Sequence, residues 1–441
     1  MWPEGLLRGK RRVMPESEKK LLRLAKNNRY EILIILVTLC GTFLRFFLWD
    51  IVSSDMEVYL RWYGRAEECG GIPGLYEIGQ RIKGYNAAFQ FVIAALTHLP
   101  GSGLYKMKAL WTAFDLLLAS GLGTFVYELM GGKSHGERNT AAFRSGVGAY
   151  ALCYLCPVVF LNSSAWGQSD AVYVALIVWS LVWLLRGKNL AAFLLLGLSM
   201  AFKLQTVFIL PFFGFYYLYK KSFSILYFLT VPGMLLLSAL PRQLIHLISP
   251  IKASAAATAP AAEAARDLPN ILAVYINQIA SGSKLCMEYP GFWSFLPDLE
   301  PGPGGFADFF KFRNAAILLC FAILLLLLVL MLKKPMEDSR KFLYAAFLLS
   351  FTTVFFLPCM LDRYGYLYEV LAIALVFLDR RTLLPAVSLH LVMAYVIAGR
   401  VGIEMYHVPM RFLSVLMVMI YGAYLYLFFA GKKEEQKDAV I

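Results

Sequence analysis

The sequence predicts an all-α polytopic membrane protein, a transmembrane helical bundle with about twelve spans. Of the 441 residues, 59% are hydrophobic and only 16% are charged, so one water-soluble core could not hide the apolar side chains. Apolar runs near the roughly 20 residues that cross a bilayer recur along the whole chain. Basic residues gather in short segments between these runs, and this bias sets the direction of each crossing.

The N-terminal segment, residues 1–29, is strongly basic, with Lys and Arg side chains spread from Arg8 to Arg29. The positive-inside rule keeps such a segment in the cytoplasm beside anionic lipid. The first span, about 30–49, therefore leads outward. The mixed-charge stretch after it opens the first external loop, residues 50–106.

Residues 85–99 (YNAAFQFVIAALTHL) are apolar but shorter than a full span, which is the length typical of an interfacial helix. The charge bias favours placing them on the outer surface within the first external loop. With 107–130 as the second span, the later basic pairs then all fall inside. These pairs are Arg186/Lys188, Lys220/Lys221, Lys333/Lys334 with Arg340/Lys341, Arg380/Arg381 and Lys432/Lys433.

The transmembrane domain is predicted over 30–430, and a cytoplasmic tail follows at 431–441. A long external loop, 247–312, begins with an Ala-rich piece that reads as helix and ends with an irregular Pro-rich piece. The remaining spans are expected at about 145–161, 168–186, 189–202, 204–219, 224–246, 313–332, 341–358, 364–379, 383–400 and 409–430.

Several function classes are disfavoured by the sequence. The net charge of +13 could suggest a nucleic-acid partner, but its basic residues are dispersed among apolar segments, so no nucleic acid is expected. Cys153 and Cys156 form a C-x-x-C pattern inside an apolar run, which favours buried thiols over a redox or zinc site. No metal site and no cofactor are predicted, and no G-x-G-x-x-G motif follows a strand.

Four polar clusters from distant parts of the chain fall on the external side, near the ends of spans. Ionisable groups at membrane depth are costly unless they are paired or line a wet cavity, so this convergence predicts a functional site. The clusters are Ser54-Asp55 with Arg61, Trp62 and Tyr63; Trp166-Gly167-Gln168-Ser169-Asp170; Phe202-Lys203-Leu204-Gln205; and Asp362-Arg363-Tyr364.

Asp55 is the candidate general base, because a carboxylate beside a membrane-edge cavity could take the proton of an alcohol acceptor. The alternative is a solvated loop acid. The W-G-Q-S-D stretch suits a sugar, which could stack on Trp166 and pair with Gln168 and Asp170. An interfacial Trp with polar helix caps explains these residues equally well.

Lys203 and Arg363 are candidate phosphate-binding residues. Lys203 interrupts an apolar run and is expected at a turn between two spans, whereas Asp362 and Arg363 could instead form a local ion pair at a helix start. Further polar residues fall on the same side without a clear ranking. They are Arg242, His246, Arg400, Glu404, His407 and Arg411.

The motifs resemble the GT-C superfamily of integral membrane glycosyltransferases, and in particular bacterial mannosyltransferase-like members grouped with the PIG-V type. The resemblance covers about 40–380 and is weakest over 247–290. The similar features are SSDMEVYLRWY from Ser53, Gly70-Gly71, Tyr85-Asn86 with its apolar run, KALWTAFD from Lys108 to Asp115, Asn162-Ser163, WGQSD at 166–170, FKLQ at 202–205 and YPGFW at 289–293.

The resemblance implies an acceptor hydroxyl activated by Asp55, attack on the sugar C1 with inversion, and release of polyprenyl phosphate. It implies substrate contacts from Gln168 and Asp170, and phosphate contacts from Lys203 and Arg363. The remaining substrate-binding candidates are Trp166, Tyr85, Asn86 and Arg61. The family commonly has a His before the acid-Arg-aromatic group, but Leu361 stands here, so His407 and Arg411 become alternative phosphate ligands.

The function expected is transfer of a hexose, most often mannose in such proteins, from a polyprenyl-phosphate sugar to a hydroxyl acceptor at the extracytoplasmic face of a bacterial inner membrane. The acceptor, whether glycan, lipid or protein, is not specified. The alternative is a transporter or flippase of lipid-linked glycans, for which many spans and intramembrane charges are ordinary. The two halves of the chain show no convincing internal repeat, and the polar clusters lie at one face, which favours the enzyme.

Overall fold

The computed structural model describes residues 16–82, 84–134, 137–248, 284–296, 309–403 and 405–430, and most of these residues are helical. The strands of the described residues form two short pairs. β1 (Lys133–Ser134) pairs with β2 (Glu137–Arg138), and β3 (Cys286–Met287) pairs with β4 (Met360–Leu361). The α-helices in chain order are α1 (Glu16–Asn27), α2 (Arg29–Phe47), α3 (Ser54–Glu68), α4 (Leu75–Arg81), α5 (Ala87–Leu96), α6 (Gly103–Leu129), α7 (Thr140–Tyr154), α8 (Pro157–Phe160), α9 (Asp170–Leu185), α10 (Asn189–Phe202), α11 (Leu210–Lys220), α12 (Thr230–Ile248), α15 (Phe309–Lys333), α16 (Asp338–Phe356), α17 (Tyr366–Leu378), α18 (Leu383–Arg400) and α19 (Met410–Ala430).

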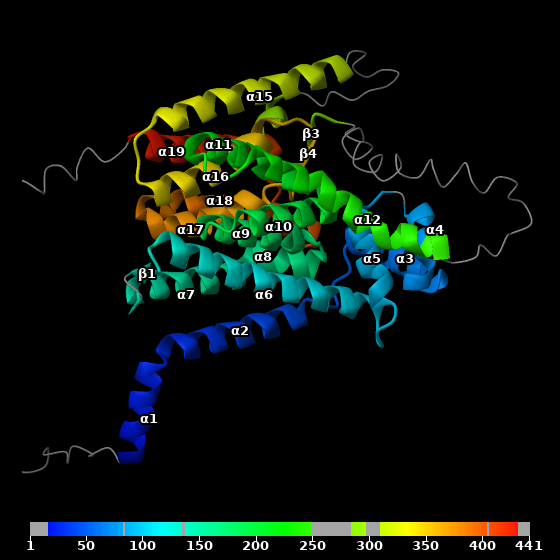
Figure 1. The fold of residues 1–441 in the computed structure, drawn as a ribbon, viewed down its shortest axis with the longest axis horizontal. Coiled ribbons are helices and arrows are strands. Elements are labelled where there is room, and N and C mark those ends of the chain that lie inside the picture. Colours follow the sequence, from blue (N-terminus) through cyan, green and yellow to red (C-terminus); the bar gives the residue numbers. More distant parts are fainter. Residues whose placement is uncertain are drawn as a thin grey trace, which may run out of the picture.

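Short helical turns of tighter or wider pitch connect several of these helices. They are η1 (Ile72–Gly74), η2 (Leu161–Trp166), η3 (Leu204–Ile209), η4 (Ile225–Leu229), η5 (Phe292–Phe295) and η6 (Arg380–Thr382). Most of the long helices run alongside one another, which gives a bundle elongated in one direction (Figure 1).

Six helical segments among the described residues are long and apolar enough to cross a membrane, or seven if the bent pair α7 and α8–η2 is one span. The six are Arg29–Phe47, Gly103–Leu129, Ile225–His246, Phe309–Lys333, Arg380–Arg400 and Met410–Ala430. The prediction of an all-α polytopic membrane protein is thereby confirmed.

Helices occupy all twelve predicted spans, but several are shorter than a bilayer crossing requires. The apolar helices α9, α10 and α17 have 16, 14 and 13 residues. The predicted span at 145–161 is broken into two parts, α7, which ends at Tyr154, and α8 with η2, which begins at Pro157. The two parts are bent by 47° relative to each other. The number of crossings therefore stays a prediction.

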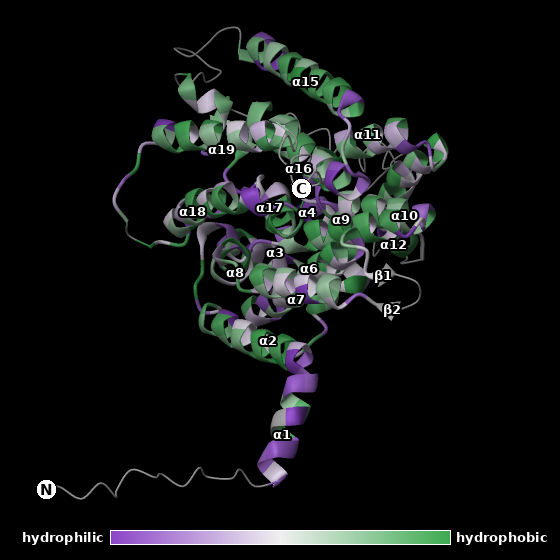
Figure 2. Ribbon diagram, turned by 90° about the vertical axis from the view of Figure 1, so that its left-hand side faces the viewer, coloured by the Kyte–Doolittle hydropathy of each residue, from purple (hydrophilic) through white to green (hydrophobic). Residues whose placement is uncertain are grey.

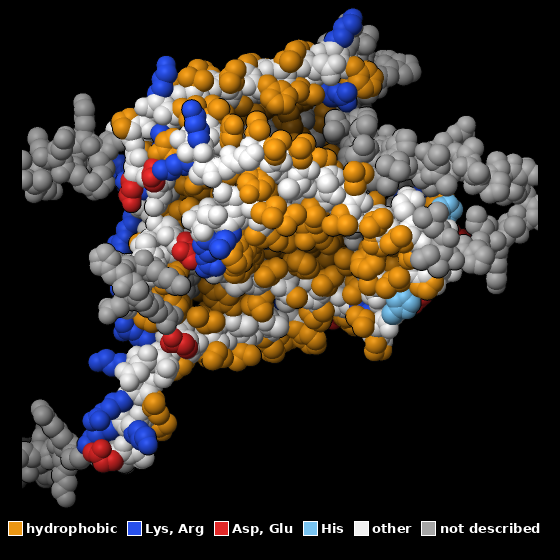
Figure 3. Space-filling model, in the orientation of Figure 1, with side chains coloured by type: hydrophobic (Ala, Val, Ile, Leu, Met, Phe, Trp, Pro, Cys, Tyr) orange, Lys and Arg blue, Asp and Glu red, His pale blue; other side chains and the backbone are white. Residues whose placement is uncertain are grey.

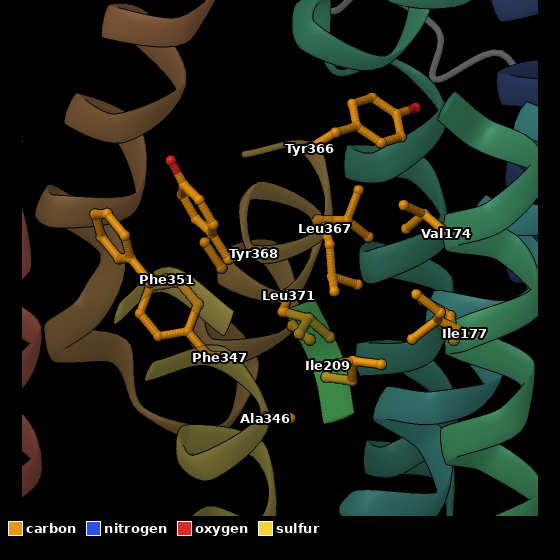
Figure 4. Close-up of a cluster of buried hydrophobic side chains, with 14 of the residues drawn as sticks. Val174, Ile177, Ile209, Ala346, Phe347, Phe351, Tyr366, Leu367, Tyr368 and Leu371 are labelled. Carbon is orange, nitrogen blue, oxygen red and sulfur yellow. The ribbon is translucent and has the colours of Figure 1, made fainter. Parts of the chain in front are cut away.

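The centre of the bundle is formed by helices that are apolar on all sides, as expected for helices with no water-facing surface. Phe347 of α16, Leu371 of α17 and Ile177 of α9 are fully buried. Their side chains pack together with Ile209 of η3, so that segments distant in the sequence share one core (Figure 4). This core holds in place the helix ends that carry the polar clusters.

Helices α2 and α15 lie at opposite edges of the bundle and present apolar surface outward (Figure 2). The large exposed side chains of α15, including Leu318, Phe321 and Leu325, suit contact with lipid. α2 is held to the bundle by a buried ion pair between Arg45 and Asp115, with Nε and Oδ2 2.7 Å apart. Asp115 belongs to this anchor and not to the candidate site.

The two ends of the bundle differ in charge. Lys and Arg side chains gather at one end, apolar side chains cover the middle, and the opposite end carries the cap built from α3, α4 and α5 (Figure 3). The cap corresponds to the predicted first external loop. α5 has ten residues, too few to cross a bilayer, and its placement along the membrane surface stays a prediction.

Several predictions fall outside the described residues. The basic segment before residue 16, the Ala-rich piece of the 247–312 loop and the tail at 431–441 are among them. The described part of the long loop, 284–296, lies against the bundle, because β3 pairs in parallel with β4.

Candidate active site

Asp55 lies in the first turn of α3, at the start of the cap. The helix begins there because Ser53 acts as its N-cap, with Oγ accepting a 3.1 Å hydrogen bond from the backbone NH of Met56. The same hydroxyl donates to the carbonyl oxygen of Trp166 at 2.6 Å. One serine therefore both starts the helix that carries Asp55 and joins it to the W-G-Q-S-D stretch.

The Asp55 carboxylate is held through one of its oxygens. Oδ2 accepts hydrogen bonds from Trp166 Nε1 at 3.1 Å and from Gln168 Nε2, and Arg363 Nη1 lies 3.4 Å away. Among the described residues no donor contacts Oδ1, and the side chain is 36% exposed. The carboxylate is thus oriented by three neighbours while its second oxygen is accessible.

Trp166 and Gln168 reach Asp55 because the chain makes a wide turn between α8 and α9. η2 is a π-helical turn, a form that is rare and concentrates at functional sites. It ends at Gly167, whose φ of +80° suits glycine. A Cβ on Gly167 would also come within 2.6 Å of Met56 Sδ, so this position requires glycine for two reasons.

Asp170 and Lys203 form a buried ion pair behind this turn. Asp170 begins α9, and Lys203 lies between α10 and η3, with side-chain exposures of 1% and 8%. Asp170 Oδ1 contacts Lys203 Nζ, and its Oδ2 accepts a 3.1 Å hydrogen bond from Asn162 Nδ2. The pair therefore leaves neither residue with an uncompensated charge.

Arg363 comes from the loop between α16 and α17. Its guanidinium lies 5.5 Å from the Trp166 ring centre, a cation–π distance, and contacts the carboxylates of Asp55 and Asp362. Burial raises the pKa of Asp362 to about 6, while the Arg363 charge lowers it. The Asp362 carboxylate lies between two guanidinium groups: its Oδ1 is 3.7 Å from Arg363 Nη1, and its Oδ2 contacts Arg400 Nε.

A chain of hydroxyl groups connects the site to the cap. Tyr59 donates to Gln168 Oε1 at 3.2 Å, its oxygen is 2.9 Å from the Tyr85 hydroxyl, and Tyr85 is 3.3 Å from Ser169 Oγ. Burial raises the pKa of Tyr59 well above its usual value, so this hydroxyl stays protonated and can donate. Gln168 is fixed by this bond with its amide nitrogen toward Asp55.

A cavity of about 570 Å³ lies beside the cluster, between η3, α15 and the loop that follows α16. Its polar lining residues are Tyr85, Asn86, Lys203, Gln205 and Arg363, with Arg313 and Asn314 at the start of α15. Its apolar lining residues include Phe202, Leu204, Val207, Phe208, Ile317, Phe321, Leu357, Pro358, Met360 and Leu361.

The structure brings most of the predicted site residues together. Contacts join Asp55, Trp166, Gln168, Tyr85 and Arg363, whereas Asp170 and Lys203 form a pair of their own, of which Lys203 lines the same cavity as Tyr85, Asn86 and Arg363. The others are not joined to them by any described contact. Arg61 is exposed on α3, and His407 and Arg411 are exposed before and within the first turn of α19. Their predicted roles as substrate and phosphate ligands thus receive no geometric support.

Two charged residues outside the predicted site set contact or line the site: Arg400, which was among the unranked polar residues of the sequence, and Arg313, which was not named. Arg400 ends α18 and bridges Asp362 and Glu288, so it joins the 284–296 segment to the loop of Arg363. Arg313 lines the cavity from α15. Arg400 could have been found as a cation at the end of a span, but nothing in the sequence distinguished it from its neighbours. Within the described residues no group of three or more His, Cys, Asp or Glu side chains is placed to hold a metal ion.

Residues 140–219 match the model of a family described as MptA_B family, alpha-(1->6)-mannopyranosyltransferase, N-terminal domain. Comparison with curated proteins gives no match. The matched stretch contains the W-G-Q-S-D turn and Lys203, but neither Asp55 nor Arg363. It supports a GT-C-like mannosyltransferase, as the sequence motifs predict, and gives no support for the narrower PIG-V-related group. The chain is therefore a polytopic membrane protein in which residues 140–219 are similar to a mannosyltransferase family model.

Proposed function

We propose that the protein is an inverting mannosyltransferase that moves mannose from a polyprenyl-phosphate donor to a hydroxyl acceptor at the extracytoplasmic membrane face. The observation that carries this proposal is Asp55, whose Oδ2 is held by three groups while Oδ1 is accessible, next to a cavity lined by both cationic and apolar side chains. A lipid-linked sugar donor requires both kinds of lining, since its sugar phosphate is polar and its tail is apolar.

The side chains that line the cavity match the two chemical parts of such a donor. The sugar would lie beside Tyr85 and Arg363, which are connected to Asp55 through the Arg363 contact, and the phosphate would lie among the cations that line the cavity. The prenyl chain would extend along Phe208 of η3 and Ile317 of α15. Because α15 lies at the edge of the bundle with apolar side chains facing outward, a lipid tail could enter from the membrane (Figure 2).

The chemistry follows from Asp55 as the general base. The acceptor oxygen attacks the sugar C1 from the face opposite the phosphate, and its proton passes to Asp55 Oδ1. The bond from C1 to the phosphate oxygen breaks, and its electron pair leaves with the polyprenyl phosphate. Attack from the opposite face inverts the configuration at C1, and nearby cations stabilise the charge that develops on the leaving phosphate.

A transfer assay tests the donor class. Purified protein is incubated with polyprenyl-phosphate mannose or with a nucleotide-activated mannose, and glycolipid and glycan products are identified by mass spectrometry. We expect mannose transfer from the lipid-linked donor only, with inverted anomeric configuration. Transfer from the nucleotide sugar, or a retained configuration, would refute the proposed donor or mechanism, and movement of the intact lipid without transfer would indicate a transporter.

The membrane side is tested through Cys69, which follows α3 in the cap. A variant that keeps only this cysteine is expected to react with a membrane-impermeant maleimide in intact cells or right-side-out vesicles. Burial raises the pKa of Cys69, so labelling is performed above pH 8. A variant that keeps only Cys40, exposed on the lipid-facing helix α2, is the matched control and is expected to stay unlabelled. Labelling of Cys69 only after the cytoplasmic side is opened would invert the proposed topology.

A further inference from the structure

We infer that Arg313, at the start of α15, binds the phosphate of a prenyl-phosphate lipid in the cavity. This inference rests on the proposed function and names a residue for it that the sequence motifs do not contain. Arg313 lines the same cavity as Lys203 and Arg363, but it comes from a different element, α15.

Arg313 differs from the other two cations that line the cavity in its charge balance. Lys203 is paired with Asp170, and Arg363 is paired with both Asp55 and Asp362. These two cations are therefore already compensated by carboxylates of the protein. Arg313 takes part in no ion pair among the described residues, so it adds a positive charge to the cavity wall that an anion could neutralise.

The Arg313 guanidinium also has buried NH groups without hydrogen-bond partners among the described residues. Nε and Nη1 of Arg313 are both buried, and neither has a hydrogen-bond partner among the described residues. Buried polar groups that lack partners are rare in native proteins, and a planar guanidinium presents its NH groups in the geometry that phosphate accepts. The guanidinium is packed 5.1 Å from the ring centre of Phe310, which restricts its position.

Arg313 is also aligned on α15 with apolar residues that line the cavity. Arg313, Ile317 and Phe321 follow one another at four-residue spacing on α15, and all three line the cavity. A phosphate at Arg313 would therefore continue directly into a tail that packs along Ile317 and Phe321. An arginine above an apolar stripe matches a molecule with one anionic end and one hydrocarbon chain.

Binding of farnesyl phosphate and of farnesol to purified protein tests the inference without any sugar transfer. The wild type is expected to bind farnesyl phosphate about tenfold or more tightly than farnesol, which corresponds to about 1.4 kcal/mol or more. Arg313→Gln is expected to remove this difference while binding of farnesol stays unchanged, and Arg313→Lys to retain part of it. Lys311→Gln is the matched control, an exposed cation on the same helix turn that does not line the cavity.

Unchanged farnesyl phosphate binding by Arg313→Gln would overturn the inference. So would displacement of farnesyl phosphate by an equal amount of phosphatidylglycerol, which would identify a general phospholipid site. A wild type that binds farnesyl phosphate through Arg313 but transfers no mannose from a polyprenyl-phosphate donor would refute the proposed function and leave the lipid site standing.

Discussion

Replacing Asp55 with Asn is expected to lower the rate of mannosyl transfer by about 10²–10⁴-fold, the usual contribution of a general base. An Asn side chain has nearly the same size and can still accept hydrogen bonds from Trp166 and Gln168 through its carbonyl oxygen. It cannot take up the acceptor proton at neutral pH. The change is measured as kcat for transfer from polyprenyl-phosphate mannose by purified protein.

The folded state is expected to tolerate this substitution. The Asp55 side chain is partly exposed, and its contact with Arg363 is long at 3.4 Å, so the loss of stability is expected to be about 1 kcal/mol or less. Glu57→Gln is the matched control, because Glu57 is an exposed acid on the same turn of α3. Wild-type turnover by Asp55→Asn, or an equal loss in Glu57→Gln, would remove Asp55 as the base.

The sequence was sufficient to predict the helices and the side of the bundle on which the polar clusters lie. Apolar runs and basic pairs are local signals, and they placed Asp55, Trp166 and Arg363 at the ends of predicted spans on one side. The break between α7 and α8 has a local signal, Pro157 at the first position of α8, but the apolar run over 145–161 favoured one continuous span. The π-helical turn was not predicted, because it lies where Gly167 packs against Met56. Such close packing between distant segments has no local pattern.

The sequence also did not predict which charged residues form ion pairs with each other. Lys203 was interpreted as a phosphate ligand, but the structure places it against Asp170, since the packing of α10 on α9 brings both side chains into one buried space. Arg313 illustrates the opposite case. A cation at the start of a long apolar helix is ordinary, and only the cavity beside it indicates a ligand.

Replacing Lys203 alone should distinguish a structural ion pair from a phosphate ligand. Lys203→Met leaves Asp170 buried and uncompensated, and the free energy of unfolding is expected to fall by about 3–5 kcal/mol. Asp170→Asn added to this variant is expected to restore most of that loss, because an amide oxygen can still accept the hydrogen bond from Asn162. The matched control is Lys220→Met in the exposed pair with Asp338, which is expected to cost about 1 kcal/mol or less.

The double variant of Lys203 and Asp170 then separates the two roles by kinetics. Because Asp170 already compensates the Lys203 charge, we expect the donor KM of the stable double variant to rise less than that of Arg313→Gln. Chemical denaturation in detergent micelles gives the coupling energy between the two positions, and donor titrations give KM. If the single and double variants lose equal stability, the ion pair is not a structural unit. If the double variant is stable but its donor KM rises tenfold or more, the Lys203–Asp170 pair contacts the donor and is not merely structural, because the protein is still folded while donor binding is weaker.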